Sequence, residues 1–213
     1  MAISEPSSAR VPKPLRRNLL IDVGLVVVVV ACGVADQTAT PVEIATAFVE
    51  AYGALDAETV ASYLDEDADL QLFNADSEGL PMALRWDQAA GFEVLLDSCA
   101  ETRSGPAGSV VRCDYDYHAI RSEEIGLGPY SGNWLDLTVV DGKITSAFDH
   151  LETSSNGFSS EMWEPFAAWV AENHPDDVIT MYGDPSQTAM ELTDEAIALW
   201  EERTREYADV VGG

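Results

Sequence analysis

One stretch of this chain, residues 133–151, constrains the fold more than any other. Leu135 and Leu137 alternate with polar or aromatic residues, and the period of two continues beyond the pair Asp141-Gly142. Asp-Gly tolerates the positive φ angles of a tight hairpin turn. The pattern therefore predicts a β-hairpin, because a helix would not alternate so regularly.

The chain is very acidic, with 38 Asp and Glu residues against 11 Lys and Arg, a formal charge of −27. Residues 1–32 carry a net charge of +2, which leaves −29 for the rest. Such a surface repels phosphate backbones and anionic lipid headgroups, so we expect no nucleic-acid partner. A length of 213 residues suits one domain with additions.

The beginning of the chain has the layout of an export signal. Lys13, Arg16 and Arg17 precede residues 23–31, which are apolar except for one glycine. This apolar run is too short for a comfortable membrane span. It ends at Cys32, where a signal of this kind is cleaved.

The letters VVAC that end this signal resemble the lipobox of bacterial lipoproteins, in which the cysteine becomes the lipidated first residue. The resemblance implies a signal over residues 1–32, palmitate on Cys32 and a tether over residues 33–40. It also implies export and a lipid anchor at the cell membrane, on the extracytoplasmic side. The alternative is an ordinary signal peptide with an incidental cysteine, which would make the protein secreted.

The cysteine count agrees with an oxidising compartment. If Cys32 carries lipid, Cys99 and Cys113 remain as an even pair, and we predict a disulfide between them. The bond would close a loop of about 15 residues, for which chain entropy gives about 3 kcal/mol. Two free buried thiols are the alternative if the protein is not exported.

Capping residues and apolar spacing predict three helices before the long strands. The letters TPVE at residues 40–43 contain the parts of a capping box, and an apolar face then runs to Gly53. Asp56 is expected to cap a second helix, followed by a strand near Leu70 and a loop over residues 74–81. Asp87 is expected to cap a third helix, with an inward face made of Phe92, Leu95, Leu96 and Cys99.

The second half of the chain predicts strands followed by helices. The letters SVVRCDYDYHAIR at residues 109–121 favour a long strand, which the hairpin follows. Ser160 is expected to cap a helix, and Thr193 a last helix that packs on the sheet or on the preceding helix. The apolar stripe of the last helix is Ile197, Trp200, Thr204, Tyr207 and Val211.

This order of elements resembles the nuclear transport factor 2-like and SnoaL-like superfamily. The resemblance is carried by FVEAY and LDAE within residues 48–58, by ADLQLF at residues 68–73, and by VDGKI followed by Phe148-Asp149. It implies an α+β fold in which a cone-shaped, curved antiparallel sheet is closed by three N-terminal helices.

The resemblance also implies how the chain is divided. The SnoaL-like domain would cover residues 41–157, and residues 158–213 would form a C-terminal helical extension packed on the same domain. The letters WEPFAAWVAENHPDD and LTDEAIALWEERTREY in the extension resemble the tails of uncharacterised actinobacterial exported proteins and lipoproteins of this superfamily.

Enzymes of this superfamily, such as polyketide cyclases and ketosteroid isomerases, remove a proton next to a carbonyl with a pocket carboxylate. The resemblance implies Asp149 as this residue, with Tyr117 and His118 as further catalytic candidates. Burial between apolar walls raises the pKa of a carboxylate toward neutrality, which suits a general base. Under strict alternation the side chain of Asp149 would lie on the other face of the strand from Ile144 and Phe148, unless a bulge intervenes.

Other polar candidates are Tyr115, Asp136 and His150. The sequence contains no HExxH, CxxC, G-x-S-x-G, P-loop or dinucleotide fingerprint. We therefore expect no metal and no cofactor.

We expect an exported, membrane-tethered lipoprotein whose SnoaL-like domain is a ligand-binding or accessory module and not an enzyme. Its expected partners are a small apolar ligand, the membrane through the lipid anchor, and a second copy of the chain. One alternative is a small-molecule isomerase, cyclase or dehydratase with Asp149 as general base. Another is a protein-interaction platform that dimerises through the open face of the sheet.

Metabolic labelling with palmitate tests the lipobox. We expect the full-length chain to take up label and the Cys32→Ser variant to lose it, because only the thiol of Cys32 accepts the lipid. Label that persists in the variant would contradict the lipoprotein interpretation.

Overall fold

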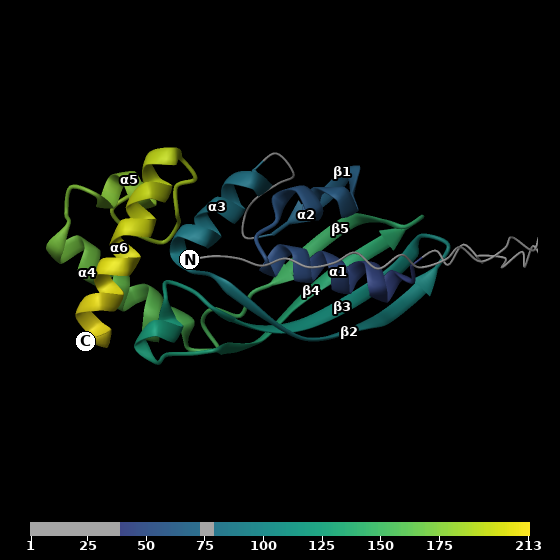
Figure 1. Cartoon of the computed structure of the whole chain (residues 1–213), viewed down its shortest axis with the longest axis horizontal. Coiled ribbons are helices and arrows are strands. Elements are labelled where there is room, and N and C mark those ends of the chain that lie inside the picture. The colour runs from purple at the N-terminus through teal and green to yellow at the C-terminus, as the bar shows by residue number, and fades with distance from the viewer. Residues whose placement is uncertain (1–38, 73–78) are drawn as a thin grey trace, which may run out of the picture. The chain divides into compact units, whose positions relative to one another are not determined.

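The computed structural model describes residues 39–72 and 79–213, so Cys32 and the predicted signal lie outside the described residues. Within that part, five strands form one curved, unclosed sheet in the order β1-β5-β4-β3-β2, and helices accompany it (Figure 1). Neighbouring strands are antiparallel except β1 and β5, which are parallel. The strands are β1 (Leu64–Gln71), β2 (Glu93–Gly105), β3 (Gly108–His118), β4 (Tyr130–Val140) and β5 (Lys143–His150).

The predicted α+β fold with N-terminal helices is thereby confirmed. The helices are α1 (Pro41–Gly53), α2 (Ala57–Tyr63), α3 (Leu80–Ala90), α4 (Glu164–Asn173), α5 (Val178–Tyr182) and α6 (Asp194–Gly212). Two short turns of helix, η1 (Ser122–Ile125) and the π-type η2 (Ser159–Trp163), lie between them. In the described part of the chain, no helix is both long and apolar enough to cross a membrane.

Helix α1 covers the inner face of the sheet and contacts β2, β3 and β4. The predicted capping box is present, since the Thr40 side chain accepts from the Glu43 amide and the Glu43 carboxylate accepts from the Thr40 amide. Ile44, Phe48 and Tyr52, which recur every four residues, are buried and form the predicted apolar face of this helix. Burying side chains of this size contributes about 1.5–3 kcal/mol each, so this face anchors the helix to the sheet.

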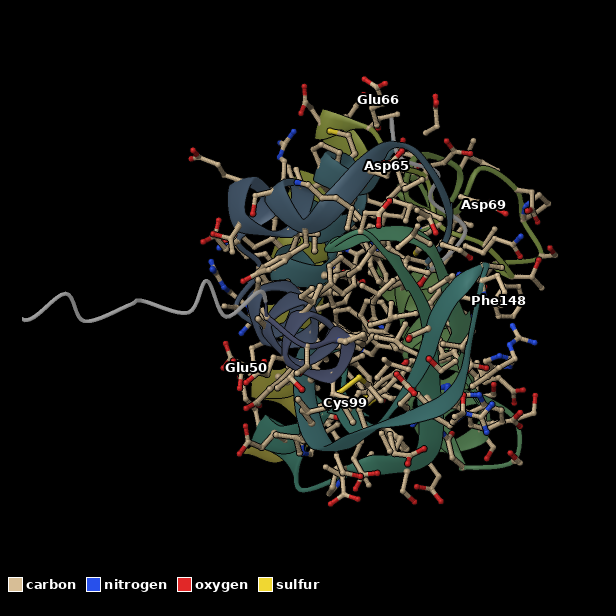
Figure 2. All side chains as sticks on the ribbon, turned by 90° about the vertical axis from the view of Figure 1, so that its right-hand side faces the viewer. Glu50, Asp65, Glu66, Asp69, Cys99 and Phe148 are labelled. Atoms are coloured by element: carbon tan, nitrogen blue, oxygen red, sulfur yellow. A yellow bond between two sulfur atoms is a disulfide. The ribbon has the colours of Figure 1, made fainter. Side chains whose placement is uncertain are left out.

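The predicted hairpin is formed by β4 and β5. Asp141 and Gly142 join the strands with φ angles of 48° and 82°, as a two-residue turn of type I′ requires. On β4, Leu135, Leu137 and Val139 are buried, as their alternation predicts. Glu50, Asp65, Glu66 and Asp69 point away from this core (Figure 2).

A β-bulge interrupts the alternation of β5. Thr138 pairs with Ser146 and Val139 pairs with Ile144, so Thr145 is an extra residue on this strand. Beyond the bulge the inner and outer faces exchange. Phe148, with 40% of its surface exposed, therefore lies on the outer face.

The predicted helix beginning at Asp87 is wrong. Helix α3 instead starts at Leu80, within the predicted loop, and ends where Gly91 adopts a left-handed φ of 65°. The residues expected to form the helix's inward face lie on or next to the edge strand β2, whose exposure does not alternate cleanly. Leu95 and Leu96 on this strand have the adjacent apolar character that also suits a helix, so the pattern was ambiguous.

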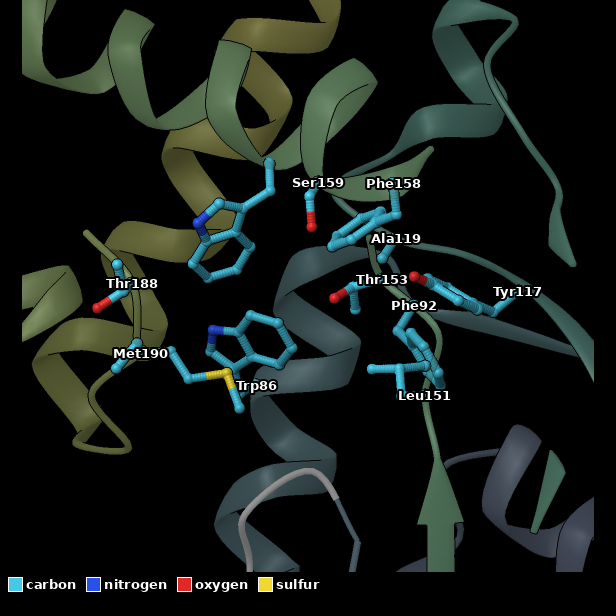
Figure 3. A pocket seen from close by; sticks show the side chains of 12 residues that line it. Trp86, Phe92, Tyr117, Ala119, Leu151, Thr153, Phe158, Ser159, Thr188 and Met190 are labelled. Carbon is cyan, nitrogen blue, oxygen red and sulfur yellow. The ribbon is translucent and has the colours of Figure 1, made fainter. Parts of the chain in front are cut away.

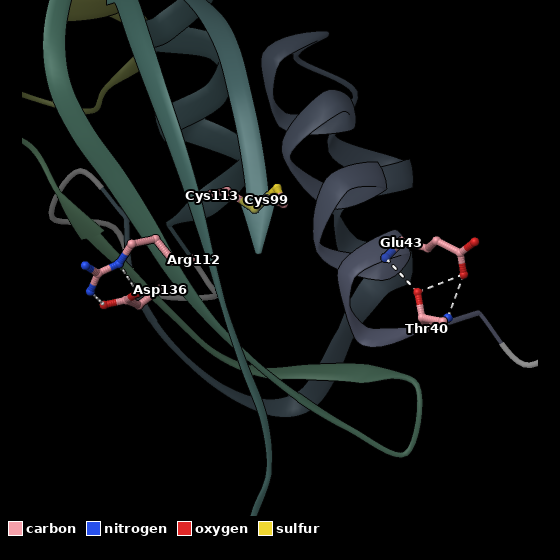
Figure 4. The surroundings of a disulfide bond; sticks show 6 residues. All are labelled: Thr40, Glu43, Cys99, Arg112, Cys113 and Asp136. Atoms are coloured by element: carbon pink, nitrogen blue, oxygen red, sulfur yellow. Dashed lines mark hydrogen bonds and ion pairs between the residues drawn. A yellow bond between two sulfur atoms is a disulfide. The ribbon is translucent and has the colours of Figure 1, made fainter. Parts of the chain in front are cut away.

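The predicted disulfide is present. Cys99 and Cys113 lie directly opposite each other on the paired strands β2 and β3, with an S–S distance of 2.02 Å (Figure 4). Cys113 is fully buried beneath α1. Cys99 belongs to the strand β2 and not to the predicted third helix. The bond fixes the register of the edge strand next to the core.

The C-terminal residues pack on α3. Thr193 caps α6 as predicted, since its side chain accepts from the amide of Ala196 at 3.1 Å. Helix α6 contacts both the preceding helix α5 and α3, and the Thr204 hydroxyl donates to the Ala89 carbonyl at 3.2 Å. Four residues of the predicted stripe are buried, whereas Val211 is 50% exposed at the last turn.

Candidate functional site

A buried carboxyl group lies at the end of β5. The β-bulge turns Asp149 to the inner face, opposite the buried Leu135 of β4. Its Oδ1 accepts a hydrogen bond from the Tyr115 hydroxyl at 2.7 Å. Its Oδ2 is buried and has no hydrogen-bond partner among the described residues. The bulge thus places the predicted Asp149 inside the fold.

A second buried carboxyl group belongs to Asp87 in α3. This side chain is 1% exposed, and its Oδ2 accepts from the Tyr52 hydroxyl of α1 at 3.0 Å. Its Oδ1 has no hydrogen-bond partner among the residues that the structure describes. From the sequence, Asp87 is predicted to be a helix cap, a position that gives no sign of a buried carboxyl group. Helical spacing from the buried Leu80, Ala83 and Leu84 would have shown that Asp87 shares their inward face.

The two carboxyl groups form what we call the acid pair, Asp87 and Asp149. Burial raises the pKa of each to about 7, against an opposing effect of the tyrosine hydroxyl that donates to each. The negative charge of Asp149 further raises the pKa of Asp87, so the two sites are electrostatically coupled. Burial and the nearby carboxylates raise the pKa of Tyr52 and Tyr115 as well, which keeps both hydroxyls protonated as donors.

A cavity of about 300 Å³, lined by uncharged side chains, lies between α3, the end of the sheet and the C-terminal residues. Figure 3 shows the hydroxyls of Tyr117, Thr153 and Ser159 turned toward the space that the aromatic rings surround. The lining comes from α3, the end of the sheet and the C-terminal residues. It consists of Trp86, Phe92, Tyr117, Ala119, Leu151, Thr153, Phe158, Ser159, Trp163, Thr188, Ala189 and Met190.

Neither acid of the pair lines this cavity, but both are close in sequence to residues that do. Trp86 precedes Asp87 in α3, and Leu151 follows Asp149 by two residues, so each acid is attached to a lining residue. Burial is the main cause of the raised pKa of Tyr117, whose ring lines the cavity, and the charge of Asp149 adds a smaller effect. The cavity and the acid pair are therefore neighbours that can influence each other electrostatically.

The other two predicted catalytic residues have different positions. Tyr117 lines the cavity, packed between the rings of Phe92 and Phe158 with centroid distances of 5.6 and 5.4 Å. His118 is buried, and its Nδ1 lies 3.0 Å from the Ser122 hydroxyl, a contact within the turn after β3. The structure thus brings Tyr117 to the cavity and assigns His118 to a local structural contact.

The remaining polar candidates lie on the outer face of the sheet. Arg112 donates to both carboxylate oxygens of Asp136 at 2.9 Å (Figure 4). His150 lies 3.2 Å from the same carboxylate and stacks on Trp134 at 4.5 Å. His118 and His150 therefore contact different groups, and within residues 39–72 and 79–213 no cluster of three metal-ligating side chains occurs.

The C-terminal residues cover the end of the sheet without filling the cavity. Phe158 and Trp163 line it, whereas Phe166 packs on Trp200 at 5.5 Å outside the lining. The π turn η2 carries Ser159 and Trp163, so this irregular turn positions two lining side chains. The extension thus completes the cavity wall.

No protein-family model and no curated protein matches this chain. Among solved structures, one similar protein is a putative polyketide cyclase from Pseudomonas putida, 13% identical, covering 54% of this chain and 92% of its own, with a TM-score of 0.40. An NTF2-like protein of unknown function from Cytophaga hutchinsonii is 13% identical, with coverages of 53% and 90% and a TM-score of 0.38.

A third similar structure is a protein with a ketosteroid isomerase-like fold from Catenulispora acidiphila, in complex with trimethylamine. It is 17% identical, with coverages of 57% and 94% and a TM-score of 0.40. All three TM-scores lie below 0.5, so what those proteins bind or catalyse is not transferred to this chain.

The acid pair predicts an unusual dependence of stability on pH. Each carboxyl has a pKa of about 7 when folded and about 4 when unfolded, so between these values the folded chain binds more protons. The contribution of each carboxyl group to the free energy of unfolding therefore falls as the pH rises from about 4 to about 7. We expect Asp87→Asn to stabilise the protein at pH 8 by about 1–3 kcal/mol, and to have little or an opposite effect at pH 4.

Urea unfolding between pH 4 and 8 measures this difference. Asp97→Asn is the matched control, because Asp97 is an exposed aspartate on β2. If the stability curves of Asp87→Asn and the unmodified protein stay parallel across this range, the acid pair does not bind the extra proton.

Proposed function

We propose that this chain is an exported, lipid-anchored module that binds a small molecule in the cavity next to the acid pair. The observation that supports this best is the cavity of about 300 Å³, which three separate parts of the chain line with aromatic and hydroxyl-bearing side chains. Concave sites of this size with mostly apolar walls and a few converging polar groups are typical of ligand-binding pockets.

Binding is favoured over catalysis by the chemistry of the lining. The residues that line the cavity include no acid, base or thiol that titrates near neutral pH, since neither Asp87 nor Asp149 is among them. A general base has to reach the proton that it removes, directly or through one water. The hydroxyls of Thr153, Ser159 and Tyr117 can orient a ligand by hydrogen bonds, which is what a binding site needs.

The anchor belongs to the same proposal. The lipobox-like ending of residues 1–32 supports attachment through Cys32, and the small polar residues 33–40 suit a tether that separates the anchor from the folded domain. The large negative charge keeps the domain away from anionic headgroups. A binding module held in this way samples ligands outside the membrane.

Narrowing the cavity tests the binding site. Thr153→Phe places a ring where the hydroxyl now points inward, and we expect it to weaken binding of the neutral fluorescent probe N-phenyl-1-naphthylamine about tenfold. Ser154→Phe is the matched control, because Ser154 is the exposed neighbour outside the lining. Equal probe affinity in both variants and the unmodified chain would contradict the cavity as binding site.

One observation favours a second candidate, a small-molecule isomerase, cyclase or dehydratase. Asp149 has a pKa of about 7, one unpartnered oxygen and a tyrosine donor, which are properties of a general base. For this function, deuterium exchange next to the carbonyl of simple cyclic ketones would be faster with the protein. Asp149→Asn would slow that exchange about 100-fold. No exchange above the buffer rate, measured by proton NMR in D₂O, would exclude this candidate for those ketones.

A further inference from the structure

The cavity has a wall made largely of aromatic rings. Trp86, Phe92, Tyr117, Phe158 and Trp163 contribute rings, and none of the lining residues carries a charge. The face of an aromatic ring is electrically negative and attracts a cation within about 6 Å of its centre. Tryptophan is the strongest of these rings, and the cavity has two of them.

Neither acid of the pair has a cationic partner in the part of the chain that the structure describes. Among residues 39–72 and 79–213, every ion pair of an arginine or histidine is made with an acid other than Asp87 or Asp149. Each acid has a tyrosine donor on one oxygen and none on the other. Buried carboxyl groups are normally paired with a cation or a metal, and no described residue supplies a cation to either acid.

Both features point to the same ligand chemistry. The rings attract a cation at short range, and the partly ionised acid pair adds a negative field through an interior where charges are weakly screened. A neutral apolar ligand would gain only from burial of its surface. The net charge of −27 also raises the local concentration of cations around the domain.

We propose, building on the proposed small-molecule binding, that the ligand is an organic ammonium ion whose alkyl or aryl groups contact the rings of the cavity. The positive charge lies against Trp86 and Trp163 and faces the acid pair across the wall. The hydroxyls of Thr153 and Ser159 accept from, or donate to, a polar group elsewhere on the ligand. Inorganic metal ions do not fit this wall, because the lining offers them no carboxylate or imidazole ligand.

A pair of isosteric probes tests the charge. Choline and 3,3-dimethylbutan-1-ol have the same shape, but the first has a trimethylammonium group where the second has an uncharged tert-butyl group. We expect choline to bind at least about tenfold more tightly in calorimetric titrations at constant ionic strength, as desolvated contacts between a cation and aromatic rings imply. Equal affinity, or tighter binding of the alcohol, would overturn the inference.

This result is separable from the proposed function. If N-phenyl-1-naphthylamine binds the unmodified chain and loses affinity with Thr153→Phe, the cavity binds small molecules whichever isostere is preferred. A preference for the alcohol then rejects only the ammonium ion. If neither the neutral probe nor either isostere binds, both the proposed function and the inference fail.

Neutralising the acid pair tests where the preference originates. In the double variant Asp87→Asn and Asp149→Asn, the ratio of choline affinity to alcohol affinity should fall at least about threefold, because the field behind the wall is lost. Asp97→Asn removes one surface charge and should leave the ratio unchanged. An unchanged ratio in the double variant, or an equal fall in the control, would reject the role of the acid pair. Circular dichroism of each variant establishes that it is folded.

Discussion

The position of one extra residue in β5 determines what the inner face of this sheet contains. Without the bulge at Thr145, the phenyl ring of Phe148 would enter the core and Asp149 would face solvent. With it, Ala147 and Asp149 point inward, opposite Leu137 and Leu135 of the neighbouring strand. The buried tyrosine contact and the coupling to Asp87 both depend on that inversion. Bulges often redirect a side chain at a functional site in this way.

Burying two carboxyl groups costs free energy that a purely apolar interior would not. Two hydroxyl donors offset only part of this cost, since the pKa of each acid stays near 7. Selection for stability alone would favour an amide or an apolar residue at these positions, because fold specificity does not require the charge. Stabilisation from the surrounding core, from α1 and from the disulfide between β2 and β3 offsets this free-energy cost. Such a local departure from stable packing is more typical of a functional site than of a structural one.

The sequence predicted those parts of the fold whose signals are local. The capping box of α1, the Asp141-Gly142 turn and the Thr193 cap each depend on residues adjacent in the chain, and all three are present. The strand β2 was missed because it lies at the sheet edge, where solvent reaches both faces and apolar residues do not alternate. Because the helix was predicted to begin at Asp87, the burial of this side chain within α3 was not predicted. Asp149 was identified by resemblance, but its direction depended on a bulge that no single-residue pattern specifies.

The C-terminal residues change what the inner face of the sheet can do. The aromatic side chains that line the cavity come from both parts, Trp86 and Tyr117 from the sheet and its helices, Phe158 and Trp163 from the residues after it. Neither part alone encloses the space. The indole nitrogen of Trp163 also donates to the Gln187 carbonyl at 2.9 Å, a contact that favours the position of its ring at the wall. If the C-terminal residues served only to close a pocket without a function, their aromatic rings would be expected to fill it. The extension keeps about 300 Å³ open, near two acids that have no cationic partner among the described residues, and that combination supports the proposal that the extended domain as a whole binds a ligand.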